Sequence, residues 1–161
     1  YPSRRWPVPD WMESRPLLYD EVIDEAEKLG MTVIFSIYAM HWPDPFLQTE
    51  QAIELAKIAA AELYERYGAR KCFGGWYWTY EYPPGCASGR DSLRRIVPAV
   101  RAIADCPIMI APNADRPLCS TTLQEIDVDI IAYQDTVGLG VEPDIFGRYA
   151  RADRFRSRPG R

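Results

Sequence analysis

The chain has 161 residues, 47% hydrophobic and 26% charged, a composition typical of a globular domain. No apolar run approaches the roughly eighteen residues of a membrane-spanning helix, so no membrane partner is expected. The net charge of −4 is uneven: residues 148–161 hold six Arg and one Asp, which leaves −9 for residues 1–147. An acidic body argues against nucleic-acid binding, and an Arg-rich tail without apolar periodicity is typical of disorder.

Apolar residues at helical spacing predict two helices in the first half of the chain. The first has Pro16 in its first turn and Gly30 at its end, with the stripe Leu18, Val22, Ala26 and Leu29. TVIFSIY at 32–38 then predicts a strand. The second helix runs from a possible cap at Thr49 to Gly68, with the stripe Ile53, Ala56, Ala60, Leu63 and Tyr67.

FGGWYWTYE at 73–81 predicts the next strand, and Asp91 is suited to cap a third helix. The stripe of that helix is Leu93, Ile96 or Val97, Val100, and Ile103 or Ala104. PIMIAP at 107–112 and VDIIAYQ at 128–134 predict two further strands. Near-continuous apolar strands that alternate with helices indicate a parallel sheet and an α/β fold.

The chain contains no GxGxxG or GxxxxGK[ST] motif, which favours a (β/α) barrel over a doubly wound nucleotide-binding fold. A barrel of this kind needs eight strands and about 250 residues. We therefore expect residues 1–147 to form a partial (β/α)8 TIM barrel of about four β/α units. It would be a fragment of a longer barrel unless a second chain completes it, and 148–161 would be a disordered tail. The start, YPSRRWPVPDW, lacks an initiator Met and a signal-peptide core, so any targeting segment was removed or never included.

Active sites of parallel α/β proteins lie at the carboxyl ends of the strands. The residues that close the four predicted strands are polar and aromatic: Tyr38, His41 and Trp42; Tyr80, Glu81 and Tyr82; Asn113 and Asp115; Gln134 and Asp135.

Glu81 stands out because strand alternation separates it from the bulky aromatics. Trp76, Trp78 and Tyr80 share one face, which fits the layer under the helices, whereas Tyr77 and Glu81 share the other face with Gly75 and Thr79. Glu81 would then lie at the barrel mouth, where partial desolvation raises the pKa of a carboxyl and suits a general acid. The alternative is a solvated strand-end acid or a salt bridge to Arg90.

Asp135 is the second candidate acid. The ends of its strand and of the Glu81 strand would lie roughly 10 Å apart with one strand between them, and side chains that lean inward could reach the roughly 5 to 9 Å used by glycosidases. The alternative is a turn acid that bonds its own backbone ahead of Thr136 and Gly138.

The remaining candidates would bind substrate. Asn113 and Gln134 could donate to sugar hydroxyls, or could serve in a turn and a strand-end contact. Tyr38 and Trp42 could stack on a pyranose ring, or could cover the core. His41 has no GxSxG partner motif, which leaves it a sugar contact or a plain loop residue.

Four cysteines and one His do not have the spacing of a zinc site, so we expect no metal and no cofactor. Cys72 and Cys106 each begin a predicted strand, at the pole opposite the site. Cys86 and Cys119 lie in loops at the site pole, where a disulfide is geometrically plausible, and two free thiols are the alternative.

GMTVIFSIY, GGWYWTYEY and DIIAYQDTVG resemble, in this order, the blocks GMKV, GWYxPxE and DIIxxQDGVG of an uncharacterised family of glycoside-hydrolase-like TIM barrels. The family is catalogued as a domain of unknown function and often occurs in exported bacterial proteins. The resemblance runs from about residue 18 to about residue 140 and implies a (β/α)8 barrel that acts on carbohydrate. It points to Glu81, Gln134 and Asp135. Thr79 stands where the family often has Pro, Thr136 replaces the Gly of QDG, and the family's first and last strands have no counterpart here.

We therefore expect a glycosidase in which Glu81 donates a proton and Asp135 acts as nucleophile or base. Tyr38, His41, Trp42, Tyr80, Asn113 and Gln134 would contact an oligo- or polysaccharide. One alternative is a non-catalytic carbohydrate-binding barrel. The other is a metal-dependent enzyme that uses Glu81, Asp115 and Asp135, which a single His disfavours. The resemblance implies an extracellular or periplasmic location.

Overall fold

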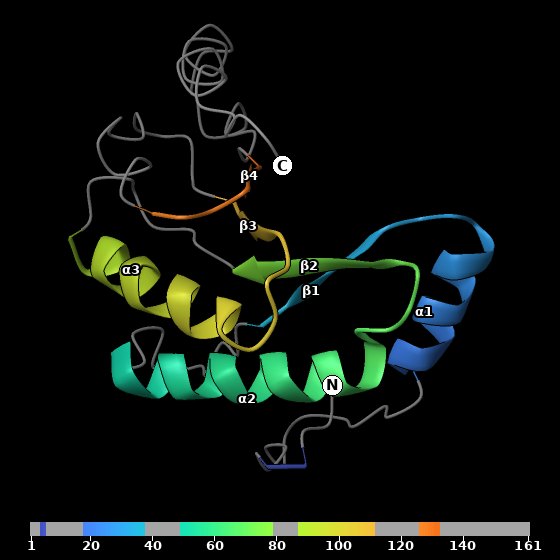
Figure 1. The fold of residues 1–161 in the computed structure, drawn as a ribbon, viewed down its shortest axis with the longest axis horizontal. Helices are drawn as coiled ribbons and strands as arrows, with labels where there is room; N and C mark the ends of the chain where they lie inside the picture. Colours follow the sequence, from blue (N-terminus) through green and yellow to red (C-terminus); the bar gives the residue numbers. More distant parts are fainter. Residues whose placement is uncertain (1–3, 6–17, 38–48, 79–86, 112–125, 133–161) are drawn as a thin grey trace, which may run out of the picture.

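A computed structural model describes residues 4–5, 18–37, 49–78, 87–111 and 126–132. Three helices and four strands alternate along these segments (Figure 1): α1 (Leu18–Lys28), β1 (Val33–Ser36), α2 (Thr49–Tyr67), β2 (Phe73–Trp78), α3 (Ala87–Arg101), β3 (Ile108–Ile110) and β4 (Ile130–Ile131). The described part of each strand lies inside the range predicted for it.

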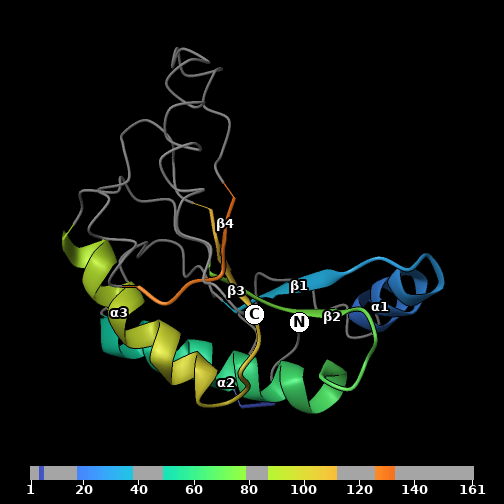
Figure 2. The same ribbon diagram turned by 45° about the horizontal axis from the view of Figure 1, so that its top comes forward.

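The four strands form one parallel sheet in the order β1-β2-β3-β4. Helices α2 and α3 lie along the same face of this sheet (Figure 2). The predicted α/β class is therefore correct, and sequential parallel pairing is compatible with part of a barrel.

The face of the sheet under α2 and α3 contains the core. Phe35, Trp76 and Ile108 occupy one row across β1, β2 and β3, and at most 3% of each residue is exposed. Trp78 and Ile110 form the next row and are also buried. The prediction that Trp76 and Trp78 lie under the helices is therefore confirmed, whereas Tyr80 lies outside the described residues.

Helix α2 follows the sequence prediction closely, because its whole predicted stripe is buried in this core. It begins at Thr49 and ends at Tyr67, directly before Gly68. The buried stripe is Ile53, Ala56, Ala60, Leu63 and Tyr67.

Helix α1 ends as predicted but presents a different face to the core. Gly30 adopts φ +65°, and Met31 N donates to Ala26 O over 2.8 Å, the bond that closes a helix with a left-handed glycine. Ile23 and Ala26 are buried, whereas Leu18, Val22 and Leu29 are 46 to 64% exposed. The predicted core stripe was therefore wrong except at Ala26, because the polar face of α1, not its apolar stripe, is bound to α2.

Helix α3 begins earlier than predicted. It starts at Ala87, so Asp91 lies inside the helix and does not cap it. Asp91 is exposed and pairs with Arg94, 3.5 Å away and three residues further along the helix. The predicted apolar stripe is correct, since Leu93, Ile96, Val97 and Val100 are all buried.

An irregularity at the start of β2 decides which face each of its side chains occupies. The register passes from Val33–Phe73 to Ile34–Gly75, so β2 carries one extra residue, Gly74. Strict alternation would place Phe73 and Trp76 on opposite faces. Instead their rings meet edge to face at 5.1 Å, because the extra residue returns Phe73 to the helix-covered face.

Candidate functional site

The predicted site residues lie outside the described residues. These are the proposed acids Glu81 and Asp135 and the proposed sugar contacts Tyr38, His41, Trp42, Tyr80, Asn113 and Gln134. Asp115, Cys86, Cys119 and the tail 148–161 lie outside them too, and the side chain of Arg90 is not described. Their roles remain predictions, and what the structure provides is the arrangement of the strands that lead to them.

The carboxyl ends of β2, β3 and β4 are level with one another. Trp78 pairs with Ile110, and Ile110 pairs with Ile131, so these three residues form one row. Neighbouring parallel strands are about 4.8 Å apart, which puts β2 and β4 roughly 10 Å apart with β3 between them. This spacing was predicted for the strands that precede Glu81 and Asp135.

A row of four residues crosses the face of the sheet opposite α2 and α3, and of these only Tyr77 was assigned to this face from the sequence. Ser36, Tyr77, Met109 and Ile130 follow one another across the four strands, and each is half-buried or exposed. Tyr77 was predicted to face away from the helices but was not named as a site residue. Alternation within β2 and β3 is the signal that identifies Tyr77 and Met109 as its members.

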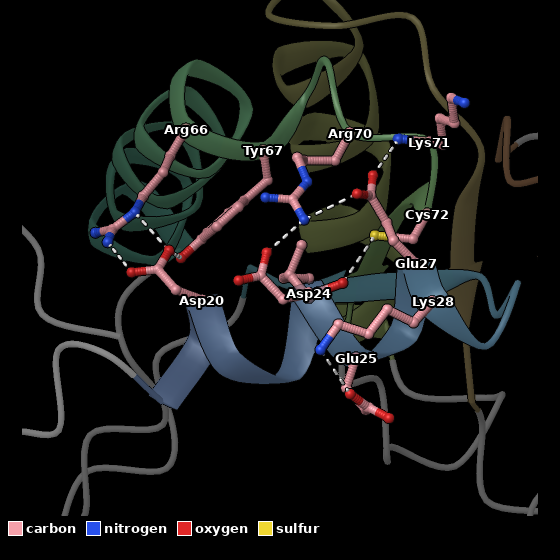
Figure 3. A network of polar contacts seen from close by, with 11 residues as sticks. Asp20, Asp24, Glu25, Glu27, Lys28, Arg66, Tyr67, Arg70, Lys71 and Cys72 are labelled. Carbon is pink, nitrogen blue, oxygen red and sulfur yellow. Dashed lines mark hydrogen bonds and ion pairs between the residues drawn. The ribbon is translucent and has the colours of Figure 1, made fainter.

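The amino ends of β1 and β2 are held by a polar network between α1 and the end of α2 (Figure 3). Arg66 and Tyr67 both donate to the carboxylate of Asp20, Tyr67 Oη over 2.9 Å. Arg70 binds Asp24 at 2.6 Å and Glu27 at 2.9 Å. This network fixes α1 in place at the end of the sheet opposite the predicted site.

Two pKa values in this network are shifted in ways that matter for stability. Burial, and then the hydrogen bond to Asp20, raises the pKa of Tyr67 to about 12. The hydrogen bond from Tyr67, helped by Arg66, lowers the pKa of the Asp20 carboxyl. The network therefore favours a neutral phenol and an ionised carboxylate.

Tyr67→Phe is expected to remove part of the alkaline sensitivity of the fold. A folded-state pKa above the unfolded value contributes stability that is complete below pH 10 and is lost as the pH rises toward about 12. The free energy of unfolding of the parent chain should therefore fall over this window, and Tyr67→Phe should flatten the fall. Urea unfolding at several pH values measures both slopes. The exposed Tyr64 provides the control, and an equal flattening by Tyr64→Phe would contradict the assignment.

A second polar cluster, which the sequence analysis did not predict, joins the end of α3 to the amino ends of β3 and β4. The side chain of Arg101 is 13% exposed and binds Asp105, Asp127 and Asp129 at 3.3, 3.1 and 2.6 Å. It also donates to the carbonyl oxygens of Cys106 and Asp127. Asp129 accepts a further bond from Ile108 N, so Arg101 connects the helix to both strands.

The two described cysteines, Cys72 and Cys106, are free and lie just before β2 and β3, at the pole opposite the predicted site. This is the placement that the sequence analysis gave them. Burial raises the pKa of the Cys106 thiol, which keeps it in the unreactive protonated form.

Two kinds of structure are not found within the described ranges. They contain no group of three or more His, Cys, Asp or Glu side chains that could hold a metal ion. Among the same residues, no helix has the length and apolar character needed to cross a membrane.

The described residues form a parallel α/β protein in which β2, β3 and β4 end level with one another. The family model of a domain of unknown function, DUF4434, matches residues 4–153. The chain therefore belongs to the DUF4434 family, in agreement with the resemblance of its sequence blocks. It matches no curated protein.

Among solved structures, the chain resembles the crystal structure of a putative alpha-L-fucosidase from Bacteroides thetaiotaomicron VPI-5482. The TM-score is 0.61 at 22% sequence identity, and the match covers 87% of this chain. It covers 52% of the fucosidase chain, so the present chain spans about half the length of that protein. At this identity the similarity establishes a shared fold.

Proposed function

We propose that this chain is part of a (β/α)8 barrel of a glycoside hydrolase that acts on an oligo- or polysaccharide. The observation that carries the proposal is that β2 and β4 end level with each other, with β3 between them. Glu81 follows Trp78 by three residues, and Asp135 follows Ile131 by four. Both acids would then lie shortly after the ends of strands whose backbones run roughly 10 Å apart, within reach of a shared glycosidic bond.

In the proposed reaction Glu81 protonates the leaving oxygen of the glycosidic bond. Asp135 either attacks the anomeric carbon or activates a water molecule that does so, depending on the distance between the two carboxyl groups. Alternation carried on from Trp78, which faces the helices, would direct Glu81 away from them, whereas Asp135, four residues past the helix-facing Ile131, would have to turn to the same side in the loop after β4. Similarity to a protein named as a fucosidase supports a carbohydrate substrate.

The sugar subsite would be formed by the other strand-end residues. Asn113 and Gln134 each follow the Trp78–Ile110–Ile131 row by three residues, as Glu81 does. They would donate to hydroxyl groups, while Tyr38 and Trp42 would pack against the ring and His41 would contact the substrate from its loop. Tyr80, on the helix-covered side of its strand by alternation, would contact the sugar only from beyond the strand end. We place the protein in the extracellular or periplasmic space, as the polysaccharide substrate suggests.

Glu81→Gln in the full-length protein is expected to reduce glycoside cleavage by about 10²- to 10⁴-fold, the usual contribution of a general acid, and to leave sugar binding intact. Release of reducing sugar from an unactivated oligosaccharide, whose leaving oxygen needs a proton, and calorimetric titration with the same oligosaccharide measure the two effects. Glu21→Gln, on the exposed surface of α1, provides the control. Turnover of Glu81→Gln at the parent rate would refute the assignment.

A further inference from the structure

Two hydroxyl groups come from neighbouring positions on the face of the sheet opposite α2 and α3. Ser36 on β1 pairs in register with Tyr77 on β2, and neighbouring parallel strands are about 4.8 Å apart. Ser36 is exposed and Tyr77 is half-buried, whereas Phe35 and Trp76, the residues before them, are buried in the core on the other face. The described core therefore does not use these two side chains.

The row that contains them combines hydrogen-bonding groups with apolar surface. Each hydroxyl can donate one hydrogen bond and accept others, and the Tyr77 ring adds an apolar body below its polar tip. Met109 and Ile130 continue the row on β3 and β4 without a charged group. A sugar carries the matching combination, since its hydroxyl groups surround an apolar carbon ring, whereas a charged ligand would find no counter-charge in this row.

Strand alternation places Tyr77 on the same side as the proposed proton donor. Glu81 follows Tyr77 by four residues, and strand geometry carried on beyond Trp78 would put the two on one face, with Tyr77 about 13 Å deeper. Both side chains would stand out from the sheet over this face. An oligosaccharide that meets Glu81 with its scissile bond would therefore have its deepest unit above Tyr77.

The next positions on this face are small on the other two strands. Ala111 follows Met109 by two residues and Ala132 follows Ile130 by two, so alternation gives them the same face. Ala132 N donates to Ile110 O over 2.9 Å, which continues the ladder of β3 and β4 to this level. At these two positions no large side chain separates the row from the level of the predicted strand-end residues.

We propose that Tyr77 and Ser36 form the floor of the sugar site and that their hydroxyl groups bind the deepest sugar unit. This rests on the proposed function, because it adds two binding residues to the site that the strand ends were proposed to form. Tyr77 acts as a specificity-determining residue and not as an acid or base. A site that bonds a sugar hydroxyl discriminates against a sugar that lacks this hydroxyl, because its own polar group would then be left unpaired.

Tyr77→Phe removes one hydroxyl group and keeps the ring, so it tests the proposed bond directly. The probe is the oligosaccharide that the full-length protein binds most tightly on a glycan array. Tyr77→Phe should raise its dissociation constant and KM about 5- to 10-fold, the usual effect of losing one such bond, and should leave kcat within about 2-fold. Calorimetric titration in the Glu81→Gln background, in which cleavage is slow, measures the dissociation constant.

Tyr64→Phe is the matched control, because it removes the same atom from a 40% exposed position on α2, and it should bind the oligosaccharide as the parent does. Urea unfolding establishes that each variant is folded. Ser36→Ala, at an exposed position, should weaken binding by a similar factor, and it repeats the test if Tyr77→Phe does not fold.

Folded Tyr77→Phe and Ser36→Ala proteins that bind the oligosaccharide as tightly as the parent overturn the proposal and leave the roles of Glu81 and Asp135 standing. A full-length parent that binds no glycan overturns the proposed function together with it. Equal weakening by Tyr64→Phe would also overturn the proposal, because the effect would then not depend on the face of the sheet that Tyr77 occupies.

Discussion

Gly75→Ala should lower the free energy of unfolding by about 4 kcal/mol or more, a large part of the total for a domain of this size. Gly75 adopts φ +120°, a conformation that residues with a Cβ rarely adopt. A Cβ at this position would lie far inside the 3.0 Å that real Cβ atoms keep from Pro107 O. Pro107 O also accepts the 2.8 Å bond from Trp76 N, so it cannot move away without breaking the link between β2 and the segment before β3.

Gly30→Ala distinguishes the cost of a positive φ from the cost of the clash with Pro107 O. Gly30 also has positive φ, at +65°, but a Cβ there would meet nothing within 4 Å. We expect this variant to lose only about 1 to 2 kcal/mol, the cost of the left-handed conformation. Urea midpoints of the parent and both variants provide the comparison. Similar losses at the two positions would show that the contact with Pro107 O contributes nothing.

Arg101→Gln should cost about 3 to 5 kcal/mol, because it removes the positive partner of three aspartates around a largely buried position. Asp105, Asp127 and Asp129 would be left close together without a cation, and two backbone carbonyl oxygens would lose a charged donor. The expected loss is a fall in the free energy of unfolding. Thermal unfolding followed by circular dichroism measures it.

Arg95→Gln, in the same helix, is the matched control for Arg101→Gln. Arg95 pairs with Glu50 across α3 and α2, but the two side chains are 46% and 75% exposed. Solvent screens such a pair, so we expect a change of at most about 0.5 kcal/mol. If the two variants were equally stable, Arg101 would be an ordinary surface residue.

The sequence predicted the fold best where the apolar residues of a helical pattern are the residues that the structure buries. Helix α2 shows this, because its apolar stripe, first residue and final glycine all coincide with the structure. The parallel order was also predictable, since each long helix separates two short apolar strands. Strand ends were less predictable, because the apolar pattern continues beyond the last described pair of each ladder.

Two local predictions failed, and in α1 the reason is that tertiary contacts outweighed a local signal. In α1 the acidic residues Asp20, Asp24 and Glu27 bind Arg66, Arg70 and backbone near Lys71. These bonds turn the stripe of Leu18, Val22 and Leu29 outward. In α3, Asp91 has the residue type of a cap, but the helix continues through it to Ala87. The contacts of α1 with Arg66 and Arg70 cannot be read from residue spacing.

The candidate site stays a sequence prediction, because its residues lie outside the described part of the chain. Strand alternation correctly placed Trp76 and Trp78 under the helices, which is the basis for the opposite direction of Glu81. The extra residue at Gly74 was not predictable, because two adjacent glycines fit a regular strand as well as a bulge. It does not disturb the alternation from Trp76 onward.

The described polar clusters gather at the end of the sheet where its strands begin. The Asp20 network, the Arg101 cluster and the Gly75–Pro107 contact all lie there. These contacts, which stabilise the fold, therefore lie away from the loops that would meet a substrate. Such a division would allow substitutions at the proposed sugar contacts Asn113 and Gln134 with little effect on whether the scaffold folds.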